Sequence, residues 1–575
     1  MSDTTSSASA PTRLDGLDRK VAAGLFLFTV LVVGLTSNSM GFTRDEGYYF
    51  KAAEEYFGWF RAWWDAWSRG EFLLPFTRAV IDRHWSYNHE HPVLMKALFG
   101  LSWGILKEKL GLFTLHSTAF RFPAFVFAGL SVMFTFLLAR LFLRRSMAAV
   151  ASLLWLSMPH PFWHMHLACF DIPVCAAHLW IVYAYARGRH STRGAVLAGV
   201  AFGLGAAVKH NVLPTPALLV LHWLITEARA PRRDGVLISL PPIPLAFVSM
   251  ALLGPVVFVL HWPYLWPDLV ARYAWYLGFH FGHEHYPILY FGDLLTHPPF
   301  PRAFTYVMTA VTVPVPILCA MLLGVGLGVW SVVVLVRARL AGTPAPPSTA
   351  VPFNNATGEP TGHGALLLLL NAAFPFALWL RDSTPIFGGT KHWMNAMPFL
   401  CILAAWALEE AWTRARLAWP AVTGLQRPRT LWVACALCLV PGTFITARVH
   451  PYGLGAYNEL VGFARGAANV GFQRTFWGHE PRLVLPAINA QTRERGSIHF
   501  GDTNYDDWRM YVRDGLLRRD IGFSQSVAGS GVASVQPQGE FKEQWMDVIN
   551  TWNTTRPAEV VHAQGVPMLT VTFSP

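Results

Sequence analysis

The sequence predicts a polytopic α-helical membrane protein with about eleven transmembrane helices and a small extracytoplasmic C-terminal α/β domain. Long apolar runs recur along the chain, and a helix needs about 20 apolar residues to cross a bilayer. Of the 575 residues, 53% are hydrophobic and only 14% are charged, whereas a soluble globular chain carries about 25% charged residues. The mean hydropathy of +0.34 agrees with the membrane class.

Residues 1–20 are rich in Ser, Thr, Ala and Pro, a composition that predicts a disordered cytoplasmic segment. An uncharged apolar run follows at residues 21–37, directly after Arg19 and Lys20. This run is longer than the apolar core of a secretory signal peptide, and no clear A-x-A cleavage site follows it. We therefore predict that the run is the first transmembrane helix and is retained.

A long polar loop, residues 42–116, separates this helix from the next apolar run and is rich in tryptophan and tyrosine. Aromatic rings prefer the membrane–water interface, so we expect amphipathic helices lying at the membrane surface. The loop opens with two adjacent carboxylates, Asp45 and Glu46. Such a pair is costly at the edge of a bilayer unless water, a metal or a polar ligand meets it. Asp45 is therefore predicted to be the chemical centre of the protein.

Ten further apolar runs predict the remaining transmembrane helices. They are residues 118–139, 147–160, 171–186, 194–208, 212–227, 236–260, 304–336, 364–380, 392–411 and 430–447. Arginine gathers in alternate loops between these runs, and short loops with this bias stay in the cytoplasm. The N-terminus is thus expected inside the cell and the C-terminal region outside. The transmembrane domain, 21–447, then carries an extracytoplasmic loop at 261–303 and a cytoplasmic Pro-rich linker at 341–363.

Residues 448–575 are more polar and are predicted to form the extracytoplasmic α/β domain. Short apolar alternations at 482–485, 497–500 and 568–573 indicate strands. The six cysteines all lie in or beside apolar segments, so no disulfide framework is expected. The net charge of +11 is spread over the loops between helices rather than gathered in one block, which argues against a nucleic-acid partner and for the lipid bilayer.

Histidine, tyrosine, lysine and acidic residues gather in the loops predicted to face outward, whereas the cytoplasmic loops carry mainly arginine. Each outward loop alone is compatible with helix caps, interfacial anchors or solvated turns. Five loops on the same side are enriched in these residues, and this shared enrichment instead indicates one functional site. The members of this set are Asp45, Glu46, Tyr49, His91, Asp171, Lys209, His283, His285, Lys391 and His392.

Several short motifs, in this order, resemble the GT-C glycosyltransferases. They are similar to those of bacterial relatives of the protein O-mannosyltransferases and the aminoarabinose transferases, glycosyltransferase families 39 and 83. Asp45-Glu46-x-x-Tyr49 follows the first helix, and Arg121-x-Pro123 opens the second. Asp171 matches a second acidic position of the family, and the stretches at 282–306 and 457–478 resemble its later loops. Where the aminoarabinose branch has a lysine–proline pair, this chain has His91-Pro92, so the exact donor and acceptor of that branch are left open for this chain.

The resemblance implies a GT-C fold and an inverting transfer of a hexose or pentose from a polyprenyl-phosphate-linked donor. Nucleotide sugars are not available outside the cytoplasmic membrane, and the sequence has no Gly-rich phosphate loop, which agrees with a lipid-borne donor. Asp45 would accept the proton of the acceptor hydroxyl, and Glu46 and Asp171 would orient its partners. Positive or donor groups would stabilise the departing phosphate. The candidates for the phosphate are His91, Lys209, Arg302, Lys391 and His392; Tyr49, Arg121, His283 and His285 are further candidates for substrate binding.

Asp45, Glu46 and Asp171 could alternatively share a divalent cation, since oxygen ligands from separate loops suit magnesium or manganese. A metal-free hydrogen-bond network explains the same residues equally well, and both interpretations stay open at this point. His283-Glu-His285 lacks the H-E-x-x-H spacing of helical zinc sites, so a role in the interface or in acceptor binding is favoured.

Two other functions are compatible with the sequence. A transporter or lipid-linked-sugar flippase would place ionisable groups near the middle of its helices, where this chain has few. A scaffold that only anchors the C-terminal domain would leave the carboxylates without a role. The acceptor (protein, glycolipid such as lipid A, or cell-envelope polysaccharide), the sugar and the oligomeric state are left open, and the expected location is the inner (plasma) membrane.

Overall fold

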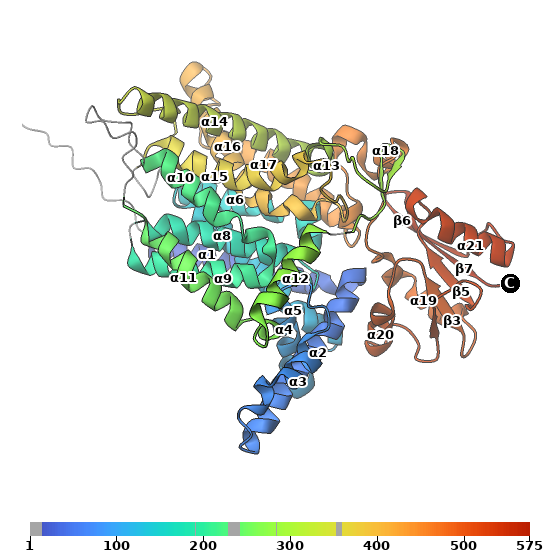
Figure 1. Cartoon of the computed structure of the whole chain (residues 1–575). Coiled ribbons are helices and arrows are strands. Elements are labelled where there is room, and N and C mark those ends of the chain that lie inside the picture. Colours follow the sequence, from blue (N-terminus) through green and yellow to red (C-terminus); the bar gives the residue numbers. More distant parts are fainter. Residues whose placement is uncertain (1–13, 190, 228–241, 283, 352, 354–358) are drawn as a thin grey trace, which may run out of the picture.

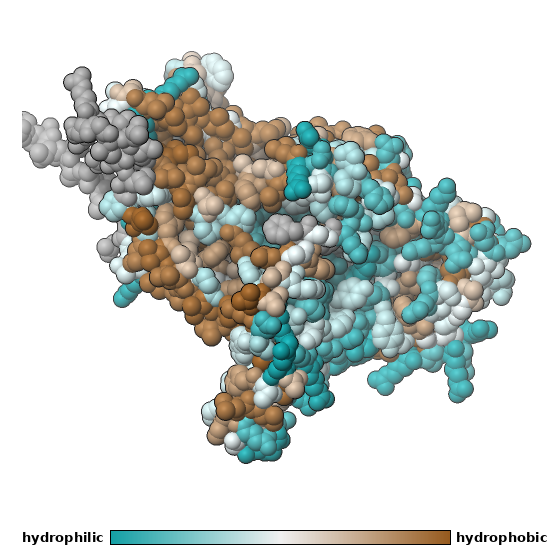
Figure 2. Space-filling model, in the orientation of Figure 1, coloured by the Kyte–Doolittle hydropathy of each residue, from teal (hydrophilic) through white to brown (hydrophobic). Residues whose placement is uncertain are grey.

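The computed structural model describes residues 14–189, 191–227, 242–282, 284–351, 353 and 359–575. Helices form a bundle that makes up most of the molecule, and the C-terminal strands and helices lie together at one end of it (Figure 1). Helices α2 (Arg44–Ser68) and α3 (Arg78–Trp85) project from the bundle as an arm. The space-filling view shows a broad hydrophobic face over the bundle and a hydrophilic surface at the C-terminal end (Figure 2).

Among the described residues, five helical stretches are long and apolar enough to cross a membrane, judged by length and composition. They are Gly16–Ser39, which contains α1 (Gly16–Thr36), α5 (His116–Ala139), α14 (Val315–Leu340), Thr361–Leu380, which contains α15 (Thr361–Ala377), and α17 (Arg429–Val449). Helices α6 (Arg145–Leu156), α9 (Thr192–Val208) and α11 (Leu245–Leu260) are apolar but shorter. The protein is thus a multi-pass membrane protein, and the count of eleven helices stays a prediction.

Proline breaks two of the apolar runs that the sequence predicted as single helices. The run at 304–336 forms α13 (Phe304–Thr312) and α14, which are separated at Val313 and Pro314. The run at 147–160 ends as α6 at Leu156, and α7 (Pro159–His164) starts anew with a proline at its first position. A proline inside a helix removes a backbone hydrogen bond but is well tolerated in a first turn, which explains both breaks.

The remaining helices connect or flank these elements. They are α4 (Leu94–Ser102), α8 (Asp171–Gly188), α10 (Thr215–Glu227), α12 (Leu269–Phe281), α16 (Met397–Ala418), α18 (Phe463–Asn469), α19 (Leu485–Gln491), α20 (Tyr505–Arg513) and α21 (Lys542–Trp552). A small hairpin, β1 (Ile288–Tyr290) and β2 (Asp293–Leu295), lies in the loop predicted at 261–303.

A mixed five-stranded sheet forms the centre of the C-terminal part, in the order β4-β3-β5-β7-β6. Its strands are β3 (Ser497–Phe500), β4 (Gly522–Ser524), β5 (Val532–Val535), β6 (Glu559–Ala563) and β7 (Val566–Phe573). Strand β3 runs parallel to β4 and β5, and β7 runs antiparallel to β5 and β6. Two predicted strands coincide with β3 and β7. The prediction at 482–485 is wrong, because this stretch is helical on both sides of Val484, with Pro481 and Pro486 in the first turns.

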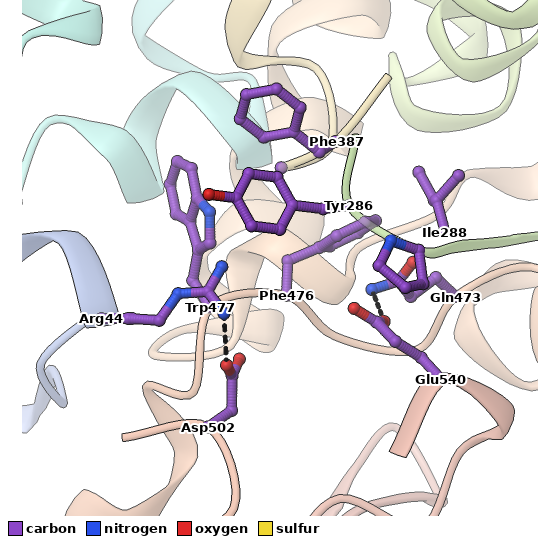
Figure 3. A pocket seen from close by; sticks show the side chains of 11 residues that line it. Arg44, Tyr286, Ile288, Phe387, Gln473, Phe476, Trp477, Asp502 and Glu540 are labelled. Carbon is purple, nitrogen blue, oxygen red and sulfur yellow. Dashed lines mark hydrogen bonds and ion pairs between the residues drawn. The ribbon is translucent and has the colours of Figure 1, made fainter. Parts of the chain in front are cut away.

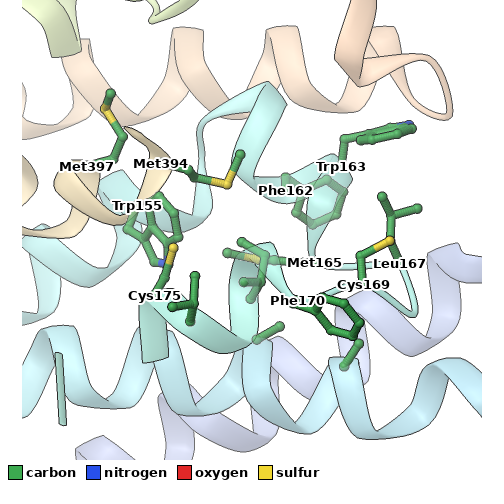
Figure 4. Close-up of a cluster of buried hydrophobic side chains, with 14 of the residues drawn as sticks. Trp155, Phe162, Trp163, Met165, Leu167, Cys169, Phe170, Cys175, Met394 and Met397 are labelled. Carbon is green, nitrogen blue, oxygen red and sulfur yellow. The ribbon is translucent and has the colours of Figure 1, made fainter. Parts of the chain in front are cut away.

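A buried apolar cluster supports the segments that carry the polar residues of interest. Figure 4 shows its side chains from α6, α7 and the connection to α8, together with Met394 and Met397. Trp155, Met165 and Cys175 have no exposed surface. Protein interiors pack as tightly as organic crystals, so this cluster fixes residues 159–171 against the start of α16.

Candidate active site

Asp45 lies in the first turn of α2, and the residues around it determine its exposure to solvent and its charge partner. Thr43 is the N-cap of α2 and forms a capping box with Glu46, so Asp45 is not needed to cap the helix. Its side chain is 26% exposed and lies 3.5 Å from the ammonium of Lys391. Asp45 is thus a partly accessible carboxylate beside a positive charge.

Glu46 is fully buried and joins three segments. Its carboxylate accepts hydrogen bonds from Nε and Nη2 of Arg121, each at 2.7 Å, and from the backbone N–H of Ala168 at 2.8 Å. Arg121, in α5, also donates to the carbonyl of Gly41 at 2.6 Å. This bidentate buried pair ties the start of α2 to α5 and to the segment before α8, and so it fixes the position of Asp45.

Asp171 and Lys209 form a second, buried ion pair. Asp171 is the first residue of α8, and Lys209 is the C-cap of α9. The Lys209 ammonium donates to the Asp171 carboxylate at 2.7 Å, and Nδ1 of His164 lies 3.6 Å from its other oxygen. Burial lowers the pKa of His164, although Asp171 opposes this shift. His164 is therefore neutral at pH 7 and adds little positive charge.

Lys391 interacts electrostatically with the carboxylates of both Asp45 and Asp171. It lies in the 3₁₀ helix Lys391–Ala396 before α16, and only 7% of its side chain is exposed. Burial lowers its pKa, and the charges of Asp45 and Asp171 oppose this shift. Its ammonium also lies 3.8 Å from the ring centroid of Trp477 and 4.8 Å from that of Phe387. Carboxylates and ammonium groups from four separate elements thus meet at one end of the bundle.

The other residues predicted for the site lie at different places around it. The ring of Tyr49 lies 4.3 Å from Phe170 and 6.1 Å from His91. His392 packs against Trp379 and Phe387, and His285 packs against Phe300. Arg302 is 70% exposed and pairs with Asp382 at 3.1 Å. His283 lies outside the described residues.

Lys96 is a functional candidate that the sequence reasoning missed. It lies in α4 with no exposed surface, and its ammonium donates to the carbonyls of Asn88 and His91. It therefore holds the loop that contains His91 next to Tyr56 and Phe170. A lysine between Leu94, Met95 and Leu98 in an apolar stretch was the available signal.

Replacing Lys96 by methionine is expected to change how stability depends on pH. Burial lowers the pKa of Lys96 from 10.5 to about 7. Between pH 7 and 10.5 the unfolded chain binds more protons than the folded one, so this residue makes stability rise with pH, by at most about 1.4 kcal/mol per pH unit. Thermal unfolding in detergent between pH 6.5 and 9.5 should reveal a smaller rise in Lys96→Met. The exposed Lys109→Met should keep the full rise, and an unchanged rise in Lys96→Met would refute this assignment.

Part of the chain matches a known family. A protein-family model described as dolichyl-phosphate-mannose-protein mannosyltransferase matches residues 99–262, and this confirms the resemblance to the GT-C enzymes over that segment. No curated protein matches the chain.

Solved structures of low sequence identity also align with the chain. ArnT from Cupriavidus metallidurans in the apo state is 15% identical with a TM-score of 0.48, over 96% of this chain and 98% of ArnT. The same protein bound to undecaprenyl phosphate is 14% identical with a TM-score of 0.47, over the same shares of the two chains. AglB from Archaeoglobus fulgidus, in complex with an inhibitory peptide and a dolichol-phosphate, is 10% identical with a TM-score of 0.44, over 90% of this chain and 66% of AglB.

Proposed function

We propose that this chain is an integral-membrane glycosyltransferase of the GT-C type that moves a sugar from a polyprenyl-phosphate-linked donor to an extracytoplasmic acceptor. The observation that carries the proposal is the partly exposed Asp45 beside Lys391, with the buried Asp171–Lys209 pair next to it. The family match supports the donor class, because its description names a dolichyl-phosphate-linked sugar. The apolar bundle supports a donor that is delivered from the bilayer.

The reaction that fits these groups is a single displacement that inverts the anomeric carbon. The oxygen of the acceptor hydroxyl forms a bond to that carbon while the bond from the carbon to the phosphate oxygen breaks. The bonding electron pair leaves with the polyprenyl phosphate, and Asp45 takes the hydroxyl proton. A positioned base of this kind contributes about 10²- to 10⁴-fold in rate.

Lys391 and Lys209 are the proposed partners of the departing phosphate. Their ammonium groups are held in place by carboxylates and are largely removed from water. Electrostatic stabilisation is stronger at such a buried site than at the protein surface. A phosphate that develops charge nearby would compete with Asp45 for Lys391. Binding of the donor would in this way free the carboxylate of Asp45 for its role as base.

The residues do not fit a cation shared by Asp45, Glu46 and Asp171. Arg121 already occupies the carboxylate of Glu46, and the two lysines pair with Asp171 and Asp45. Among the described residues, the three potential metal-ligand side chains that lie close enough to share an ion are Glu227, Glu359 and His363. Arg189 already pairs with the carboxylates of Glu227 and Glu359. We therefore propose a reaction in which lysines, and not magnesium or manganese, offset the phosphate charge.

Mass spectrometry of cell-surface glycans and glycoproteins, with and without this protein, tests the proposed function. We expect loss of one sugar from a defined acceptor when the protein is absent, and transfer by the purified protein in proteoliposomes that persists in EDTA. Solute or lipid translocation without a glycoside product would instead identify a transporter or flippase. Reporter fusions that place residue 45 in the cytosol would also contradict the proposal, which puts the N-terminus inside and the C-terminal domain outside the plasma membrane.

A further inference from the structure

Lys391 differs from Lys209 in how its ammonium is held. The Lys209 ammonium lies 2.7 Å from Asp171, within the range of about 2.7–2.9 Å for a charge-assisted hydrogen bond. The Lys391 ammonium lies 3.5 Å from Asp45, which is a looser contact. Because a lysine side chain has a flexible stem of four carbons, such a contact does not fix its end. The position of the Lys391 ammonium therefore depends on the backbone of the 3₁₀ helix Lys391–Ala396.

Aromatic rings limit the position of this ammonium on one side. It lies 3.8 Å from the ring centroid of Trp477 and 4.8 Å from that of Phe387. Both rings also line a small pocket between the bundle and the C-terminal part, together with Asp502 (Figure 3). The rings bound the space around the ammonium, and the 3₁₀ helix determines how far the side chain reaches toward Asp45.

A buried histidine is hydrogen-bonded near each end of this 3₁₀ helix. At the N-terminal end, the hydroxyl of the N-cap residue Thr390 lies 3.1 Å from Nδ1 of His160 in α7. Nε2 of His160 lies 2.9 Å from the carbonyl oxygen of Ala456. Because a carbonyl only accepts, Nε2 carries the proton and Nδ1 accepts the hydrogen bond from Thr390. His160 therefore makes both bonds as a neutral imidazole.

The second histidine, His178 in α8, is bonded to Asn395 near the C-terminal end of the 3₁₀ helix. Its Nδ1 accepts from the amide of Asn395 at 3.2 Å, and its Nε2–H donates to the amide oxygen of Asn371 in α15 at 2.9 Å. The Asn371 amide donates in turn to the carbonyl of Leu367 at 2.8 Å, which fixes its oxygen toward His178. His178 and both asparagines are buried, so loss of the histidine leaves polar groups unpaired.

These bonds connect the 3₁₀ helix to the elements that carry the rest of the site. Trp393, between the two ends, donates its indole N–H to Thr309 in α13 at 2.8 Å. The 3₁₀ helix is thus bonded to α7, α8 and α13. Since α8 begins with Asp171, the bond to His178 also fixes Lys391 relative to that carboxylate.

We propose that His160 and His178 are positioning residues: as neutral imidazoles they hold the two ends of the 3₁₀ helix and thereby set the reach of Lys391 toward Asp45 and the departing phosphate. The inference rests on the proposed function and deepens it, because it assigns a task to two buried histidines that do not touch the reacting atoms. Charges that are held in place stabilise a transition state without reorganising, and a misplacement of about 1 Å can cost about 10²-fold in rate.

A double-mutant cycle in proteoliposomes tests whether His178 acts through Lys391. The turnover number is measured at saturating donor and acceptor for the wild-type protein, His178→Leu, Lys391→Met and the double variant. We expect His178→Leu to lower turnover by about 10- to 10²-fold on its own. In the Lys391→Met background it should lower turnover by less than about twofold, because the group that it positions is gone. Losses that multiply in the cycle would overturn the proposal.

Glutamine variants and a matched histidine separate positioning from a general effect on stability. The amide of His178→Gln can donate and accept in place of the two ring nitrogens and should keep most of the turnover. His222, in α10, is also buried and uses both ring nitrogens, toward Tyr185 and the carbonyl of His363. His222→Leu should lower the melting temperature as His178→Leu does, but should leave the turnover of the folded protein unchanged.

Acylation of Lys391 provides a measurement that requires no turnover. The full-length protein in lipid nanodiscs is treated with an acetylating N-hydroxysuccinimide ester, and each lysine is quantified by peptide mass spectrometry. Relative to the exposed Lys109, Lys391 should react slowly in the wild-type protein and faster in His160→Leu and His178→Leu. Glutamine at either position should restore the slow reaction. Size-exclusion profiles verify that each variant is folded.

The two measurements distinguish failure of the inference from failure of the proposed function. Unchanged acylation of Lys391 in both leucine variants would overturn the inference, whatever their turnover. No transfer by the wild-type protein would contradict the proposed function, and the acylation rates would then still decide whether the two histidines hold Lys391 in place.

Discussion

Replacing Asp45 by asparagine is expected to lower glycosyl transfer by about 10²- to 10⁴-fold, because the side chain keeps its shape but loses the ability to accept a proton. The variant should still fold, since the helix cap is formed by Thr43 and Glu46 rather than by Asp45. The measurement is the turnover number in proteoliposomes, at saturating donor, with the sugar and acceptor identified by glycan profiling. Expression and membrane insertion should match those of the wild-type protein.

Asp65→Asn is the matched control, because Asp65 is an exposed aspartate in the same helix α2 and lies far along it from the first turn. This control should leave turnover unchanged. Near-normal turnover in Asp45→Asn would remove Asp45 from the role of base. A comparable loss in Asp65→Asn would point to a general effect of charge on α2 instead.

The residues that meet around Asp45 could be predicted as a set because they share a position relative to the membrane. Asp45, Asp171, Lys209 and Lys391 each flank an apolar run, and loop charges assigned these ends to one side. The structure pairs Asp45 with Lys391 and Asp171 with Lys209. Once the loops are assigned to one side of the membrane, few ionisable residues remain as possible neighbours of Asp45 on that side.

The contacts that position these residues could not be predicted, because they depend on packing between distant segments. Nothing local to Glu46 indicates that Arg121 and the N–H of Ala168 satisfy its carboxylate. The contribution of Trp477 and Asp502 to the pocket depends on how the C-terminal part docks on α2. Lys96 was overlooked for a related reason: carbonyls of Asn88 and His91 bind its ammonium, so no acidic partner marks it in the sequence and its place in an apolar stretch is the one local signal.

Replacing Glu46 by alanine is expected to destabilise the fold by about 3–5 kcal/mol, because it leaves the Arg121 guanidinium buried without its partner. The loss should be visible as a lower melting temperature and a smaller yield of monodisperse protein in detergent. Replacing both residues, in Glu46→Leu with Arg121→Met, removes both charges and should recover part of that stability.

Glu71→Ala provides the control for the Glu46 experiment, since Glu71 pairs with Arg69 at 3.1 Å at an exposed position. An exposed pair contributes about 0–1 kcal/mol, so this variant should unfold near the wild-type temperature. A Glu46→Ala protein as stable as wild type but inactive would contradict a positioning role and would place this carboxylate in the chemistry. A destabilised Glu46→Ala whose stability and activity both return in the double variant would instead establish that Glu46 acts by holding α2, and with it Asp45, against α5.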